Sequence, residues 1–183
     1  LVYSGAFKAL FRLMELPNLN TQRQAVSAVR DLCGNPENKI KCAEDGGIAA
    51  LVALTRQPEV QLQALSLASL RHLSTLDSLK QPIVQARAVR PALRAITNTH
   101  EDVYLQVAGL FANLSELLEN QIIMVEEGIV IGLSTLAFSE NDEVQQDTSR
   151  CLANLASNED AHLPLYKQGG LVGMVKLTEG QND

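Results

Sequence analysis

The chain has 183 residues, of which 46% are hydrophobic and only 4% are aromatic, and it contains no Trp. This length suits one domain or several small repeats, whose core must be filled by Leu, Ala, Val and Ile. The formal charge of −6 argues against a surface that coats nucleic acid, because phosphate binding requires clustered Lys and Arg.

Apolar segments of similar composition recur along the chain. They are GAFKALFRL at Gly5, GIAALVAL at Gly47, AVRPALRAI at Ala88, GIVIGLSTL at Gly128 and GLVGMVKL at Gly170. The steps between their first residues are 42, 41, 40 and 42. A period of this size predicts a repeat architecture. The expected units are residues 5–46, 47–87, 88–127 and 128–169, with a partial unit at 170–183, within one all-α domain.

Each unit is expected to contain three helices. The apolar segment predicts a short helix, and the turns LPNLN, RQPE, THED and SENDE supply N-caps and first-turn acids for a longer helix. A second break, such as GNPEN or SNEDA, precedes another short helix that ends at a Gly suited to a left-handed C-cap. No period-two alternation predicts a strand.

The four long helices align without gaps on residues 31, 72, 113 and 154, which we call the mark positions. Positions +1, −2 and −10 from each mark are mostly apolar and share one side of a helix, so they predict the core stripe. Positions 0, −4, −7 and −11 form another stripe, which is mostly polar. Stacking of long helices about 8–10 Å apart would join the polar stripes into a trough.

Asn113 and Asn154 occupy two marks, where an Asn inside a helix needs either solvent or a partner. The alternative is that both are exposed polar residues near a helix end with no binding role. Their regular spacing favours a ladder of side chains that bind a partner. Small residues at three of the four −4 positions predict a shallow trough floor. The residues expected to form its floor and walls are Ser27, Asp31, Arg71, His72, Gly109, Asn113, Arg150 and Asn154.

Charged residues in the predicted trough are unevenly distributed. Arg30 and Arg71 stand immediately before two successive marks. They could together engage an acidic or phosphorylated segment, or each could pair with a local carboxylate or lie in solvent. Asp102, Glu143 and Asp147 make the other half acidic. The pattern predicts a groove that is basic at the N-terminal repeats and acidic at the C-terminal ones.

No residue pattern predicts catalysis, a metal or a cofactor. His72, His100 and His162 lack metal-ligand spacing with each other and with the cysteines. Neither a Ser-His-Asp nor a Cys-His arrangement has a supporting scaffold, and the doublet Gly46-Gly47 lacks the Lys-Ser/Thr of a phosphate loop. The sequence therefore predicts a protein that is not an enzyme.

Cys33, Cys42 and Cys151 form no CxxC pair, so no disulfide framework is expected. An intracellular, cytoplasmic protein is the default, with the nucleus as an alternative. No apolar run approaches the roughly 20 residues of a membrane helix. The chain opens on Leu1 and closes soon after a new helical segment starts, which suggests an excerpt of a longer protein.

The repeat pattern resembles the armadillo repeat family. The resemblance rests on the Gly-Ile/Leu helix starts, on EVQ at residues 143–145 with an approximate echo in EVQLQ at 59–63, and on ANLS and ANLA at residues 112–115 and 153–156. It covers essentially the whole chain. The resemblance implies a right-handed α-solenoid, an alpha-alpha superhelix, whose third helices line a concave groove that holds extended peptide segments.

The family's ladder asparagines, which bind the peptide backbone, correspond to Asn113 and Asn154, whereas Asp31 and His72 depart from the pattern. Importin-α-like members place Trp four residues before the Asn; here those sites hold Ser27, Ala68, Gly109 and Arg150. Recognition of nuclear-localisation signals is therefore not expected. A strongly basic groove of the β-catenin type is not evident, and a vacuolar or axonemal type fits at least as well.

The sequence predicts a non-catalytic scaffold that presents a groove to an extended or helical protein segment, with no direct nucleic-acid binding and no membrane insertion. Two alternatives stay open. The chain could be a structural rod segment of a cytoskeletal, axonemal or membrane-tethered assembly, or an accessory arm of an enzyme whose catalytic domain lies elsewhere. Self-association or flanking repeats are expected to cover the uncapped ends.

Overall fold

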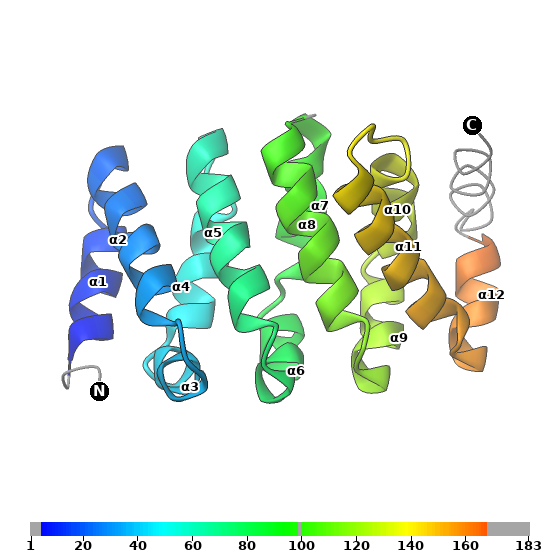
Figure 1. Ribbon diagram of the computed structural model, residues 1–183, viewed down its shortest axis with the longest axis horizontal. Coiled ribbons are helices and arrows are strands. Elements are labelled where there is room, and N and C mark those ends of the chain that lie inside the picture. Colours follow the sequence, from blue (N-terminus) through cyan, green and yellow to red (C-terminus); the bar gives the residue numbers. More distant parts are fainter. Residues whose placement is uncertain (1–4, 99, 168–183) are drawn as a thin grey trace.

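The computed structural model describes residues 5–98 and 100–167, which form a row of helices (Figure 1). Within these residues all regular structure is helical. The expectation for a partial unit at 170–183, with its apolar segment at Gly170, lies outside the described residues.

The long helices stand side by side in one layer, and each packs on the next. They are α2 (Leu19–Leu32), α5 (Val60–Leu73), α8 (Glu101–Leu114) and α11 (Asp142–Ala156). We call the outward side of this layer the long-helix face.

Two sets of short helices accompany the long ones. Behind the long-helix layer in Figure 1 lie α1 (Ala6–Met14), α4 (Gly47–Leu54), α7 (Val89–Ala95) with the 3₁₀ turn η1 (Ile96–Asn98), and α10 (Ile129–Leu136). Along one edge lie α3 (Pro36–Glu44), α6 (Asp77–Gln85), α9 (Leu118–Glu126) and α12 (Glu159–Lys167). Three helices thus recur in the same order along the chain, as the sequence predicts.

The predicted caps form at three of the four long helices. Asn18, Glu59 and Asn141 accept hydrogen bonds from backbone N–H groups in the first turns of α2, α5 and α11. These bonds satisfy donors that have no partner within the helix. The cap of α8 is His100, whose side chain makes no capping hydrogen bond, so the expectation of a side-chain cap is wrong there.

The turn that starts each apolar helix contains one residue in the left-handed region. Gly5, Gly46 and Gly128 have φ values of 100°, 98° and 91°, and Arg87 has φ 63°. These positions are separated by 41 residues each (5, 46, 87, 128). The sequence alignment, which put Gly47 and Ala88 in this column, was wrong by one residue in two units. Gly47 instead lies against Cys42 and Phe11, where an added Cβ would meet the Cys42 Sγ atom at 2.4 Å.

The predicted core stripe is buried. Val29, Leu70, Phe111 and Leu152, all at position −2 from the marks, are at most 3% exposed. At positions +1 and −10, Leu32 and Thr21 of the first unit are half-buried and the equivalent residues of the other units are buried.

Glutamine side chains connect three of the long helices to the segment that precedes them. Gln22 donates to the Met14 carbonyl at 2.9 Å, and Gln63 donates to the Thr55 carbonyl at 3.3 Å. Gln145, at the equivalent position of the fourth unit, donates to the Ser139 carbonyl at 2.8 Å. Met14 and Thr55 lie at the C-terminal ends of α1 and α4, where carbonyl groups have no partner within the helix, whereas Ser139 lies in the turn that follows α10. The glutamines therefore connect each of these long helices to the end of the preceding apolar helix or to the turn after it.

Candidate functional site

The mark positions lie at the C-terminal ends of the long helices, and none of them is buried. Asp31 is exposed, and His72, Asn113 and Asn154 are half-buried. Asp31 lies within 3.3 Å of the Arg30 guanidinium. The predicted column therefore keeps contact with solvent, as a binding surface requires.

Three mark side chains connect successive units. His72 Nε2 lies 2.8 Å from the Cys33 carbonyl oxygen, Asn113 Nδ2 donates to Ser74 Oγ at 3.0 Å, and Asn154 Nδ2 donates to Ser115 Oγ at 3.0 Å. The partners are 39 residues apart in every case. Each acceptor is the C-cap residue of the preceding long helix: Cys33 of α2, Ser74 of α5 and Ser115 of α8. We call these three contacts the inter-unit stitches.

The stitches use part of the hydrogen-bonding capacity that the sequence assigns to a partner. Since a carbonyl can only accept, His72 must carry its proton on Nε2. Asn113 is fully engaged, because its Nδ2 also lies 3.4 Å from the Arg71 carbonyl and its Oδ1 accepts from Arg150 Nη2 at 3.2 Å. Asn154 makes the stitch alone, so its Oδ1 and one amide hydrogen have no partner among the described residues.

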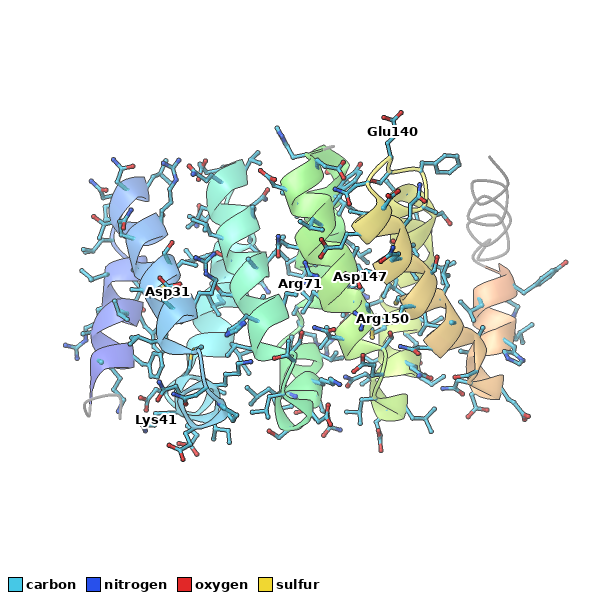
Figure 2. All side chains as sticks on the ribbon, in the orientation of Figure 1. Asp31, Lys41, Arg71, Glu140, Asp147 and Arg150 are labelled. Atoms are coloured by element: carbon cyan, nitrogen blue, oxygen red, sulfur yellow. The ribbon has the colours of Figure 1, made fainter. Side chains whose placement is uncertain are left out.

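Arg71 extends away from its own helix toward the far side of the next one. Its Nη2 atom lies 2.8 Å from Glu143 Oε1 and 3.3 Å from Asp147 Oδ2, both on α11, and its Nη1 atom donates to the Leu105 carbonyl of α8 at 3.4 Å. We call this side chain with its contacts the Arg71 bridge. Figure 2 shows Arg71, Asp147 and Arg150 close together over α8 and α11, with Asp31 well apart on α2.

Gly109 makes the bridge sterically feasible. A Cβ atom at this position would lie 2.0 Å from Arg71 Nε and 2.4 Å from Cζ. Gly109 is consequently buried, and the guanidinium covers the place that the sequence predicts to be an open trough floor. A small residue is needed at this position because the Arg71 side chain of the protein itself, and not a partner, fills the space above it.

Arg150 completes a charged network at the centre of the long-helix face. Its Nη2 atom lies 2.9 Å from Asp147 Oδ1, and its Nη1 atom lies 3.4 Å from Glu116 Oε1. Asp147 thus binds two arginines. Glu116 also pairs with Lys80, which is buried and lies 2.6 Å from Asp77. Although burial lowers the pKa of Lys80, the hydrogen bonds to Asp77 and Glu116 outweigh it and raise this pKa.

The Arg30 contact corresponds to the local-pairing interpretation, whereas Arg71 pairs with carboxylates two long helices away. Arg30 pairs with the adjacent Asp31, and Arg71 pairs with the acidic residues of α11. The basic and acidic parts of the predicted graded groove are therefore joined to each other through the Arg71 bridge. Ser27, the remaining predicted site residue, lies half-buried on α2.

The long-helix face is open between the N-terminal ends of α5 and α8. A cavity of about 560 Å³ lies there, lined by Glu59, Val60, Gln61, Ala64, His100, Glu101 and Asp102. Arg23 of α2 reaches the edge of this cavity through Glu59, at 2.9 Å. The hydrogen bond from Arg23 lowers the pKa of Glu59, and the backbone N–H groups of Leu62 and Gln61 add to this effect.

Sequence reasoning missed three participants in this site: Ser74, Ser115 and Glu116. The serines could have been noticed, because each stands two positions after a mark (72 + 2 and 113 + 2), in the same column as Cys33. Nothing in the sequence points to Glu116, whose role depends on the side chains of Lys80 and Arg150 converging from neighbouring units.

Other reactive groups of the described residues do not assemble into a site. No group of three His, Cys, Asp or Glu within residues 5–98 and 100–167 could hold a metal ion. The three cysteines are free and buried. Burial raises the pKa of Cys151 to about 12, and a hydrogen bond from the Cys42 thiol lowers the pKa of Cys33. Of the helices within residues 5–98 and 100–167, none combines the length and apolarity needed to cross a bilayer.

Comparison with known proteins gives a consistent result. No protein-family profile matches the chain. Vacuolar protein 8 of Schizosaccharomyces pombe is 27% identical over 177 residues, which cover 96% of this chain and 32% of that protein. Human catenin delta-2 is 35% identical over 98 residues, which cover 51% of this chain and 8% of that protein. The chain thus spans about a third of the length of vacuolar protein 8.

Solved structures share the whole arrangement of helices. An engineered protein superposes with a TM-score of 0.88 at 26% identity over 98% of this chain and 44% of that one. A designed armadillo repeat protein in complex with the peptide (KR)4 superposes with a TM-score of 0.87 at 22% identity, covering 98% of this chain and 77% of the design. Together with the relative that matches along its length, these structures show that the chain has the fold of armadillo repeat proteins, an α-solenoid.

Proposed function

We propose that the chain is a non-catalytic scaffold whose long-helix face binds an extended segment of another protein. The observation that carries this proposal is the column of residues eleven positions before the marks. All four are polar and exposed, one on each long helix: Asn20, Gln61, Asp102 and Glu143. A repeated polar surface of this kind suits a partner that adds many weak contacts along its length.

The free acceptor and remaining amide hydrogen of Asn154, and the cavity between α5 and α8, supply places for such a partner. An amide that offers one acceptor and one donor can bond to the backbone of an extended peptide, which presents both. The designed armadillo repeat protein that binds (KR)4 shares this fold and supports a peptide as the occupant.

The experiment is a selection of random peptides displayed on phage against the chain, followed by affinity measurements on variants. The double variant Asn113→Ala/Asn154→Ala is expected to bind the selected peptides at least tenfold more weakly. The control variant is Ser74→Ala/Ser115→Ala, which also breaks the two asparagine stitches, because it removes the acceptors, but keeps both asparagine amides. The control is expected to bind like the unmodified chain.

Two outcomes oppose the proposal. One is a selection that enriches no peptide. The other is an equal loss of binding in the asparagine and serine variants, which would assign the asparagines to stitching alone.

A structural role in a larger assembly is the second candidate function, and one feature on the opposite side favours it. A hollow of about 290 Å³ between α7 and α10 is lined in part by Leu93, Ile96 and Ile131, and Ile131 is 66% exposed. An assembly that packs through this side would lose affinity in Ile131→Glu and keep it in the asparagine double variant. A groove binder would show the reverse.

A further inference from the structure

The Arg71 bridge occupies the centre of the long-helix face. Its guanidinium joins α5 to Glu143 and Asp147 of α11, which lie 72 and 76 residues further along the chain, so it spans the intervening helix α8. The bridge remains accessible, since the side chains of Arg71 and Glu143 are 26% and 56% exposed. A segment that lies along this face would meet the guanidinium together with the more exposed Glu143, whereas Asp147 lies deeper.

The charge of the surrounding helices favours one kind of occupant. The helices α8 and α11 carry five carboxylates and a single arginine, Arg150. The carboxylates are Glu101, Asp102, Asp142, Glu143 and Asp147. Arg71 is thus a cation that α5 contributes to the acidic half of the long-helix face, which α8 and α11 form.

We propose that the Arg71 bridge is a displaceable internal occupant of the binding face, and that the segment which displaces it is basic. A Lys or Arg of the partner takes over Glu143 and Asp147, and the Arg71 side chain turns out into solvent. This inference rests on the proposed function, because it concerns the same face and names the chemistry of its ligand.

The contacts of the bridge are suited to exchange. Ion pairs that stay partly in water contribute little net stability, so a second cation can replace the first without a large penalty. The carboxylates keep a partner in both states, which avoids leaving Asp147, the more buried of the two, without a counter-charge. Only molecules in which the bridge is open can bind the partner. The apparent affinity is therefore the intrinsic affinity multiplied by the open fraction.

Gly109 provides a test that leaves every charge unchanged. In Gly109→Ala the new methyl group would overlap the end of the Arg71 side chain, which is flexible and can move away. Alanine is also the better helix former, so the variant is expected to fold. Arg71→Gln opens the bridge by a different route, since it removes the guanidinium.

The experiment measures the binding of fluorescein-labelled (KR)4 peptide to the chain by anisotropy at a fixed salt concentration. Both Gly109→Ala and Arg71→Gln are expected to bind this peptide about tenfold more tightly than the unmodified chain. Arg90→Gln, an exposed change on α7 with the same effect on net charge, is the matched control and is expected to change the affinity less than twofold. Addition of (KR)4 to the unmodified chain is expected to shift the Arg71 Nε–H resonance in ¹H–¹⁵N NMR spectra.

Three results would overturn the inference. The first is equal affinity of the unmodified chain and both variants for (KR)4. The second is a Nε–H resonance that does not move at saturating peptide. The third is binding of an acidic (DE)4 peptide that Arg71→Gln abolishes, which would make Arg71 a ligand-binding residue. Each can occur while library-selected peptides still depend on Asn113 and Asn154, so the bridge can fail without the proposed function failing.

Discussion

Gly46 has a backbone conformation that L-residues with side chains adopt only at a cost. Its φ is 98°, and an added Cβ would meet no atom within 4 Å, so the cost is purely conformational. We expect Gly46→Ala to lower the free energy of unfolding by about 1–2 kcal/mol. The control is Gly34→Ala, where φ is not in the left-handed region and the nearest atom to a new Cβ is 3.4 Å away. Urea denaturation measures both, and equal effects would contradict the expectation.

Thr148 buries a hydroxyl group that has no hydrogen-bond partner among the described residues. The equivalent residue of the preceding unit, 41 positions earlier, is the buried Val107. We therefore expect Thr148→Val to raise the free energy of unfolding by about 1 kcal/mol, because a desolvated polar group is replaced by a methyl of the same shape. This corresponds to an increase in Tm of about 2–4 °C in a chain of this size. A lower Tm would indicate a hydrogen bond that the valine cannot make.

Glu59 links stability to pH. The Arg23 hydrogen bond lowers the pKa of Glu59 in the folded state, so the ionised carboxylate stabilises the fold above its unfolded pKa. This stabilisation is lost as the pH falls from the unfolded pKa of Glu59 through its lower folded pKa. The difference in unfolding free energy between the unmodified chain and Glu59→Gln should thus be largest near neutral pH and shrink in acid. Urea titrations at several pH values measure it, with Glu140→Gln, a change at an exposed residue, as the matched control for removal of one carboxylate.

At the level of helices, the inter-unit stitches determine how neighbouring units meet. The Asn154–Ser115 stitch is the simplest to measure, because Asn113 also binds Arg150. A double-mutant cycle with Asn154→Ala and Ser115→Ala should give a coupling energy of about 0.5–1.5 kcal/mol, the usual net worth of one hydrogen bond. Additive effects of the two substitutions would show that the stitch contributes nothing to stability.

The sequence predicts the helices well and their side-chain contacts poorly. The 41-residue step and the apolar stripe locate the long helices, because burial of the −2 residues such as Phe111 depends only on helical periodicity. The contacts of the polar stripe depend on distances between units. Arg71 is predicted to face a partner, yet it reaches Glu143 across Gly109, which requires knowing how far apart α5 and α11 stand.

For the whole molecule, the row of helices implies that stability is shared between neighbours. Phe111 of α8 is fully buried, and α8 packs on both α5 and α11. We expect Phe111→Ala to lower the free energy of unfolding by about 3–5 kcal/mol. The rate of backbone hydrogen exchange should rise most in α5, α8 and α11. Exchange in α1 and α2 should change little, since each unit of a solenoid contacts only adjacent ones. Uniform loss of protection along the chain would instead indicate a single cooperative core.

The constant separation of 39 residues in the inter-unit stitches has an evolutionary consequence. A tandem duplication of the 41 residues 74–114 would copy Ser74 and Asn113 together, 39 residues apart, and would leave Ser115 39 residues before Asn154. Every unit of the longer chain would therefore keep its stitch to the preceding one without any further substitution. Such a chain could lengthen by whole modules, and the reach of its binding surface could increase in a single genetic event.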